Sequence, residues 1–123
     1  MILDAGALIA LERADPKMRG LIRRAKDRGA EMVIPARVLG QVWRDGLRQV
    51  RLATLVAARG VQVAALTEEA AKAAGQLCGR RGTSDVIDAS VVLAAREGGA
   101  AIVVTGDPDD IRRLDPTLTI VVA

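Results

Sequence analysis

The segment AAIVVTGDPDDIRRL (residues 100–114) places a short apolar run directly before three carboxylates and a helical pattern. Asp107 ends the apolar run and Pro108 follows it, which is a common way to begin a helix. The chain opens in the same way, because MILDAGALIA (residues 1–10) is an apolar run, then Asp4, then helical spacing. The sequence therefore predicts two strands that each end at an acid where a helix begins.

The rest of the chain continues this alternation of strands and helices. Further strands are predicted at EMVIP (31–35), VQVAAL (61–66) and LTIVVA (118–123). Helices are predicted at residues 5–13, 15–29, 36–59 (with a break at Gly46 as an option), 67–80, 84–97 and 107–114. Continuously apolar strands that alternate with helices predict an α/β fold, with a parallel sheet of four to five strands covered on both faces. We expect residues 1–123 to form one domain.

Composition excludes several classes of site. The chain has no histidine, which excludes Ser-His-Asp and Cys-His catalysis and any histidine-ligated metal. Cys78 is the single cysteine and cannot form an internal disulfide, which is typical of a reducing compartment. No apolar run approaches the roughly 18 residues of a membrane span. We therefore expect a cytoplasmic protein that does not associate with membranes.

The net charge of +3 is unevenly distributed along the chain. Residues 13–59 contain 12 Lys and Arg against 4 Asp and Glu, whereas residues 60–123 contain 6 against 9. A basic half beside an acidic half favours a polyanion such as RNA held against a carboxylate site. Arg44, Arg48 and Arg51 have the spacing of one helix face and are the candidates to bind RNA phosphates; the alternative is an ordinary solvated surface.

The segment DVIDASVVLAA (residues 85–95) contains a third group of acids. Asp85 is in the first turn of a predicted helix, where acids are favoured in any case. Asp88 lies three residues further along a largely apolar helix, where a charge is costly unless it is paired or bound to metal. The alternative is that this edge of the helix faces water.

Acids from three separate segments can meet at the carboxyl edge of a parallel sheet, where ligands of such sheets bind. Clustered carboxylates repel and raise one another's pKa unless a cation lies between them. Oxygen ligands without His or Cys favour Mg²⁺ or Mn²⁺, which can activate water for phosphodiester cleavage. Asp4, Asp88 and Asp107 are therefore the candidate catalytic and metal-binding residues.

The acid after the first strand, the segment DVIDASVVLAA and the segment VVTGDPDDI together resemble the PIN-domain ribonucleases, and are closest to the VapC-type toxins of bacterial toxin–antitoxin pairs. The resemblance implies a PIN-like three-layer α/β/α sandwich and Mg²⁺- or Mn²⁺-dependent cleavage of RNA. It also implies a homodimer and a small antitoxin partner. On the family's pattern, Asp4, Asp88 and Asp107 are the catalytic acids and Asp85 is an accessory acid.

Two positions depart from the pattern of that family. Gln41 stands in IPARVLGQVW, where the family usually has a glutamate, and Ala5 stands where a hydroxyl residue is often found. An amide oxygen is a weaker metal ligand than a carboxylate and cannot take up a proton. Asp45 is a candidate replacement, one turn further along the predicted helix; the alternative is an exposed acid between arginines.

Two alternatives to an active ribonuclease remain. One is a PIN-like module that binds RNA or protein but has weakened catalysis, for which Gln41 is the reason. The other is a different Mg²⁺ enzyme or receiver on a similar sheet. Gly6 stands where a haloacid dehalogenase phosphatase would have its second acid, and Lys72, the last lysine, precedes the strand where a receiver would need one. This second alternative, a different Mg²⁺ enzyme or a receiver, is therefore disfavoured.

Overall fold

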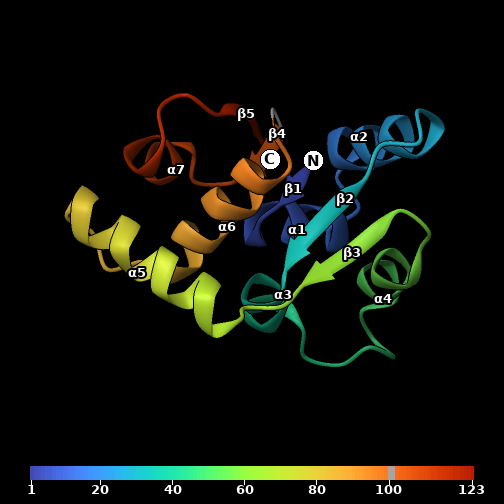
Figure 1. Cartoon of the computed structure of the whole chain (residues 1–123). Helices are drawn as coiled ribbons and strands as arrows, with labels where there is room; N and C mark the ends of the chain where they lie inside the picture. Colours follow the sequence, from blue (N-terminus) through green and yellow to red (C-terminus); the bar gives the residue numbers. More distant parts are fainter. Residues whose placement is uncertain (100–101) are drawn as a thin grey trace.

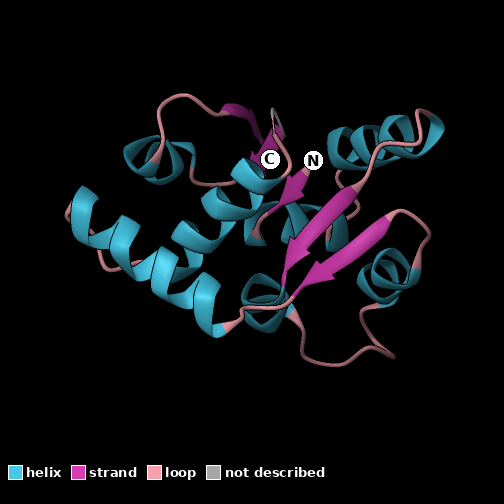
Figure 2. Ribbon diagram, in the orientation of Figure 1, coloured by secondary structure: helices cyan, strands magenta, loops and turns pink. Residues whose placement is uncertain are grey.

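The computed structural model describes residues 1–99 and 102–123 (Figures 1 and 2). In this part of the chain the strands are β1 (Ile2–Leu3), β2 (Met32–Pro35), β3 (Val61–Ala64), β4 (Ile102–Thr105) and β5 (Thr119–Val122). The helices are α1 (Ala5–Glu12), α2 (Pro16–Asp27), α3 (Ala36–Val42), α4 (Val50–Ala57), α5 (Glu68–Arg81), α6 (Val86–Glu97) and α7 (Pro108–Leu114). The strands predicted from the apolar runs are all present. The predicted start of β4 at residues 100–101 lies outside the described residues.

The strands form one parallel sheet in the order β3-β2-β1-β4-β5. The chain steps from β1 outward to β3 and then returns to β4, on the other side of β1. Because crossovers between parallel strands are right-handed, a reversal of direction moves the connecting helices to the opposite face. Helices α1 to α4 accordingly lie on one face, and α5 to α7 lie on the other (Figure 1). The prediction of a PIN-like α/β/α sandwich is confirmed.

The core lies on both faces of the central strands. β1 and β4 are fully buried apart from the first residue of β4, and their side chains meet those of α1 on one face and α6 on the other. Leu8 and Val91 are completely buried representatives of these two helices. Burial of this kind contributes about 1.5–3 kcal/mol for each large apolar side chain. This packing on both faces holds β1 and β4 in place and so fixes the positions at which they end.

The helical stretch predicted over residues 36–59 is interrupted around Gly46, as the sequence allowed, and the interruption is longer than one residue: residues 43–49 form a loop between α3 and α4. The side chain of Gln49 replaces helical hydrogen bonds: its Oε1 accepts from the backbone N–H of Arg44 at 2.7 Å and of Asp45 at 2.9 Å. Its Nε2 donates to the carbonyl of Val42 at 2.7 Å and to the Glu12 carboxylate on α1. Side-chain to backbone bonds of this type compete with helix formation, so the helix ends at α3 and restarts at α4.

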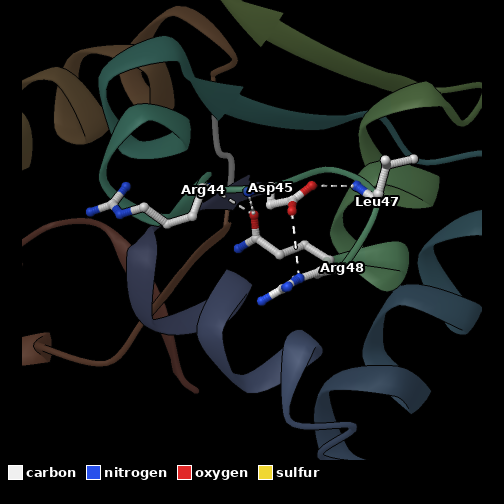
Figure 3. A network of polar contacts seen from close by, with 5 residues as sticks. Arg44, Asp45, Leu47 and Arg48 are labelled. Carbon is white, nitrogen blue, oxygen red and sulfur yellow. Dashed lines mark hydrogen bonds and ion pairs between the residues drawn. The ribbon is translucent and has the colours of Figure 1, made fainter.

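This loop also corrects the prediction that Arg44, Arg48 and Arg51 share one helix face. The Arg44 guanidinium donates to the carbonyls of Trp43 and Gly40, at the end of α3. Arg48 lies 3.7 Å from Asp45 within the loop (Figure 3), and only Arg51 is on a helix. All three side chains are exposed, but Arg44 and Arg48 project from the loop and Arg51 projects from α4.

Asp45 does not lie one turn along the helix of Gln41, as the sequence predicted. Its Oδ1 accepts from the N–H of Leu47 at 3.0 Å, which closes a turn, and its Oδ2 faces Arg48 (Figure 3). Both oxygens of the Asp45 carboxylate therefore contact groups within the loop. The alternative interpretation of Asp45, an exposed acid between two arginines, is the one the structure supports.

Candidate functional site

Asp4 and Asp107 follow β1 and β4, the neighbouring strands between which the strand order of the sheet reverses. β1 and β4 are neighbours, and Leu3 pairs with Val104. Asp4 comes directly after β1, and its backbone N–H donates to the carbonyl of Val104 at 3.1 Å. Asp107 comes two residues after β4. Both acids therefore stand at the carboxyl edge of the sheet at its switch point, where parallel α/β sheets bind ligands.

Asp4 is almost fully buried, with 6% of its surface exposed. It also caps α1, because its Oδ1 accepts from the N–H of Ala7 at 3.2 Å. Burial raises the pKa of the Asp4 carboxyl, while hydrogen bonds from the Thr105 hydroxyl and from nearby backbone amides oppose that rise. Asp4 therefore caps α1 and at the same time stands at the carboxyl edge of the sheet.

Asp88 lies in the first turn of α6, and its side chain is half-buried. Asp85 is the N-cap of this helix and accepts from the N–H of Asp88 at 3.0 Å. Burial and, after it, the neighbouring acids Asp85, Asp110 and Asp4 together raise the pKa of Asp88 to about 7. The structure therefore brings four carboxylates close enough to act on one another, from β1, α6 and α7.

Asp110 is a site residue that the sequence interpretation missed. It lies in the first turn of α7, which is a sufficient reason for an acid on its own. The signal that points to it is its spacing, since Asp110 is three residues after Asp107 on the same short helix. Its charge acts on Asp88 because α7 packs against α6.

Asp107 occupies the N-cap position of α7, yet its carboxylate makes no capping hydrogen bond with the described residues. The carboxylate is exposed, while the backbone N–H donates to Thr105 Oγ1 at 2.9 Å. Capping therefore does not explain this acid.

The sequence of the chain also matches a known protein family. A PIN domain profile matches residues 1–115, from β1 to the end of α7. The chain belongs to the PIN domain family. The comparison with curated proteins gave no match. In this PIN domain β5 lies beyond the matched residues, and it still pairs with β4 in the same sheet.

PIN domains are generally nucleases, and they typically use a divalent metal such as Mg²⁺ or Mn²⁺. The donors in this PIN domain suit such an ion chemically, because they are carboxylate oxygens whose mutual repulsion a cation would relieve. In residues 1–99 and 102–123, however, no three acidic or thiol side chains converge closely enough to hold a metal ion. The side chains would have to draw together around an ion.

Gln41 lies near the end of α3 and is exposed. α3 packs against α1, the helix that Asp4 caps.

No described helix of this PIN domain has the length and hydropathy that a bilayer crossing requires.

Proposed function

We propose that this PIN domain is a Mg²⁺- or Mn²⁺-dependent endoribonuclease that hydrolyses RNA phosphodiester bonds, and that it is the VapC-type toxin of a toxin–antitoxin pair acting in the cytoplasm. The observation that carries the proposal is the placement of Asp4 and Asp107 after the adjacent strands β1 and β4, with Asp88 on α6, whose pKa burial and the surrounding acids raise to about 7. A carboxyl group so perturbed, at the switch point of a parallel sheet, is typical of a functional site.

Asp4, Asp88 and Asp107 would supply the oxygen ligands, with Asp85 and Asp110 adding negative charge around them. A bound ion would activate water and stabilise the leaving oxygen. Asp4 is the most buried of the donors, and its carboxylate is held by the capping bond from Ala7. Asp107 is exposed, so it can approach both an ion and a substrate phosphate.

Gln41 favours a second candidate function, a PIN domain that binds RNA or a protein with weakened catalysis. An amide at this position can donate a neutral oxygen to an ion but adds no negative charge. The two candidates differ in cleavage and share the binding surface.

The partner proposal is supported by a groove between α2 and α4 on the basic half of the molecule. Its lining is apolar at Leu11, Ile22, Val50 and Leu55 and basic at Arg19, Lys26 and Arg51. Val50 is 64% exposed and adds apolar surface to this groove. This lining suits an acidic, amphipathic segment of a small antitoxin. A homodimer would compete for the same apolar residues, and light scattering of the isolated chain at high micromolar concentration tests for it.

The test is a cleavage assay on a pool of single-stranded RNAs with Mn²⁺ or with EDTA. We expect cleavage with Mn²⁺ alone, and its loss in Asp4→Asn and in Asp88→Asn. Asp27→Asn is the control, because it removes an exposed carboxylate at the end of α2, outside the site. RNA binding without cleavage under every condition would favour the binding module, and cleavage that survives both site substitutions would refute the site.

A further inference from the structure

Trp43 is the only aromatic residue of the chain, and it lies at the end of α3, where the loop of residues 43–49 begins. It is 37% exposed, although tryptophan is highly buried on average in folded proteins. Its indole packs against the backbone of Gly46, where a Cβ would lie 2.7 Å from Cζ2 of the ring and 3.2 Å from Cη2. Gly46 therefore supports the ring from within the loop, and part of the ring surface remains accessible to a ligand.

Hydrogen bonds fix the loop that carries Trp43 before any ligand binds. Gln49 accepts from the N–H of Arg44 and donates to the carbonyl of Val42. The same side chain also reaches Glu12, the last residue of α1. Ordering a loop on binding costs free energy, so a ring that is already held in place binds a ligand more tightly.

The bond between Gln49 and Glu12 also places this loop relative to the site acids. Asp4 caps the start of α1, and Glu12 ends it. The helix has 8 residues, so at about 1.5 Å per residue it spans roughly 12 Å. At about 3.4 Å or more per nucleotide, an RNA strand with a phosphate at Asp4 can therefore reach the loop within about four nucleotides.

The charged neighbours of Trp43 suit a nucleic acid. The Arg44 guanidinium uses Nη1 for its bonds to the carbonyls of Gly40 and Trp43, and within the described residues its Nε and Nη2 have no partner. The Arg48 side chain is 89% exposed and lies 3.7 Å from the carboxylate of Asp45 (Figure 3). Cations that hold phosphates beside an aromatic ring that stacks on a base are the combination by which proteins bind single-stranded nucleic acid.

We propose that Trp43 stacks on a nucleobase of single-stranded RNA, while Arg44 and Arg48 bind the neighbouring phosphates. This inference rests on the proposed function and deepens it, because it assigns a base contact that lies outside the acidic site. Every base has an aromatic face, so stacking tolerates changes of sequence. The contact therefore adds affinity for unpaired bases with little preference among them.

The fluorescence of Trp43 reports on its own contact, because the chain has no tyrosine and no second tryptophan. Two probes are titrated in EDTA, which keeps the RNA intact. One is a single-stranded RNA decamer of mixed bases, and the other is an abasic decamer with the same ribose-phosphate backbone. Fluorescence anisotropy of the labelled decamers gives the affinities of wild type and variants, and circular dichroism melting checks that each variant folds.

We expect the mixed-base decamer to quench the fluorescence of wild type by about half or more, and the abasic decamer to leave it unchanged. Wild type should bind the mixed-base decamer at least about tenfold more tightly than the abasic one. Trp43→Leu should bind both within about threefold of each other, with an unchanged salt slope, because no phosphate contact is lost. Leu47→Ala removes a 91% exposed apolar side chain from the same loop and is the matched control, which should behave as wild type.

Equal quenching by the two decamers overturns the proposal, because the ring then responds to the backbone and not to the bases. Quenching by neither overturns it as well, and leaves the ring as a surface for a protein partner. A folded Trp43→Leu that keeps the full preference for the mixed-base decamer has the same consequence. If Trp43→Leu does not fold, the comparison of the two decamers on wild type decides alone.

Binding in EDTA distinguishes this proposal from the proposed function. If wild type cleaves no RNA with Mn²⁺ while only the mixed-base decamer quenches Trp43, the nuclease function fails and the stacking contact stands. If wild type cleaves RNA with Mn²⁺ while the mixed-base decamer leaves the fluorescence unchanged, the nuclease function stands and the role of Trp43 is refuted.

Discussion

Gly6, in the first turn of α1, and Gly106, between β4 and α7, are in direct backbone contact. A Cβ on Gly6 would lie 2.5 Å from the backbone nitrogen of Gly106 and 2.7 Å from its Cα. These two residues adjoin the two strand ends of the site, since Asp4 is two residues before Gly6 and Asp107 directly follows Gly106. The absence of both side chains lets the first turn of α1 lie directly against the turn between β4 and α7.

Gly6→Ala should therefore destabilise the protein by about 1–3 kcal/mol, because the clash is with backbone and no side chain can move aside. Elsewhere in a helix the same change normally stabilises by about 0.5–1 kcal/mol. Gly40→Ala in α3 is the matched control, since a Cβ there meets nothing within 4 Å. Urea unfolding measures both, and a Gly6→Ala protein as stable as Gly40→Ala would contradict the close contact.

Asp88→Asn should stabilise the metal-free protein at neutral pH. Because the folded-state pKa of Asp88 is raised to about 7, the folded protein holds this proton more tightly than the unfolded chain. The resulting penalty is absent below the unfolded pKa near 4, grows between pH 4 and 7, and is complete above 7. We expect a gain of about 1–2 kcal/mol at pH 7.5 after discounting for the half-exposed side chain, and little gain at pH 4.

Unfolding of wild type and Asp88→Asn in EDTA at the two pH values measures this difference. Asp27→Asn is the control for removing a negative charge outside the cluster. An equal gain at both pH values would show that something other than titration of Asp88 is responsible.

Asp115 is a buried carboxylate that pairs with the partly exposed Arg96. It is 5% exposed, its Oδ2 accepts from Arg96 Nε at 2.9 Å, and its Oδ1 accepts from the N–H and hydroxyl of Thr117. The hydrogen bonds from Thr117 and the charge of Arg96 hold the pKa of Asp115 below its usual range despite burial. Its contribution is therefore present at neutral pH and is lost as the pH falls below about 4 towards the folded-state pKa.

Asp115→Asn should cost about 1–3 kcal/mol at pH 7, and the cost should shrink at pH 3. Asp109→Asn is the matched control, because Asp109 forms an exposed pair with Arg112 at 3.4 Å, and its loss should cost at most about 0.5 kcal/mol. Thermal unfolding at the two pH values decides, and an equal effect of the two substitutions would contradict a special role for the buried pair.

The sequence predicted those features of the fold that depend on local signals. Apolar runs that end at Asp4 and Asp107, with proline or helical spacing behind them, were sufficient to place two acids at strand ends. The sequence allowed a break at Gly46 but could not set the extent of the loop at residues 43–49, because Gln49 stabilises it by reaching Glu12, 37 residues away. Asp110 was missed for a similar reason: its effect on Asp88 depends on how α7 packs against α6.

Arg44, Arg48 and Arg51 should contribute unequally to RNA binding, because Arg44 is bonded to the end of α3, Arg48 faces Asp45 in the loop and Arg51 lies on α4. Arg48 is the simplest case: its side chain is 89% exposed and its pairing with Asp45 is long. Arg48→Ala should lower the slope of log affinity against log salt by roughly 0.7 on single-stranded RNA, with the fold unchanged. Arg44→Ala should also loosen the end of α3, whose carbonyls Arg44 binds.

Filter binding between 50 and 200 mM salt measures these slopes on one RNA. Arg80→Ala, in the last turn of α5, is the control for losing an exposed arginine elsewhere. A slope in the triple Arg44, Arg48 and Arg51 variant equal to that of Arg80→Ala would exclude the loop and α4 from the RNA surface.

The glutamate that the family usually has stands as Gln41 in this chain, and Asp45 was the candidate replacement. Substitutions at these two positions therefore have opposite expected effects. Gln41 is exposed on α3 and nearly equal in shape to glutamate, so Gln41→Glu adds a charge without a packing change. We expect Mn²⁺ affinity to rise about tenfold, or about 1.4 kcal/mol, with a matching gain in RNA cleavage. Metal-free stability should fall slightly at neutral pH, since the added charge joins several carboxylates. Asp45→Asn should leave affinity and cleavage unchanged, because Asp45 is occupied by Leu47 and Arg48.

Gln76→Glu, on the exposed surface of α5, is the control for adding one negative charge at a distance. Calorimetry with Mn²⁺ and cleavage of single-stranded RNA are measured on all three variants and wild type. Loss of cleavage in Asp45→Asn would mean that the loop rearranges and that Asp45 supplies the charge after all. If Gln41→Glu gains cleavage over wild type, Gln41 is what weakens the wild-type nuclease. If neither wild type nor Gln41→Glu cleaves any RNA while both bind it, a carboxylate at position 41 is not enough to give activity. The protein is then an RNA-binding module and not a nuclease.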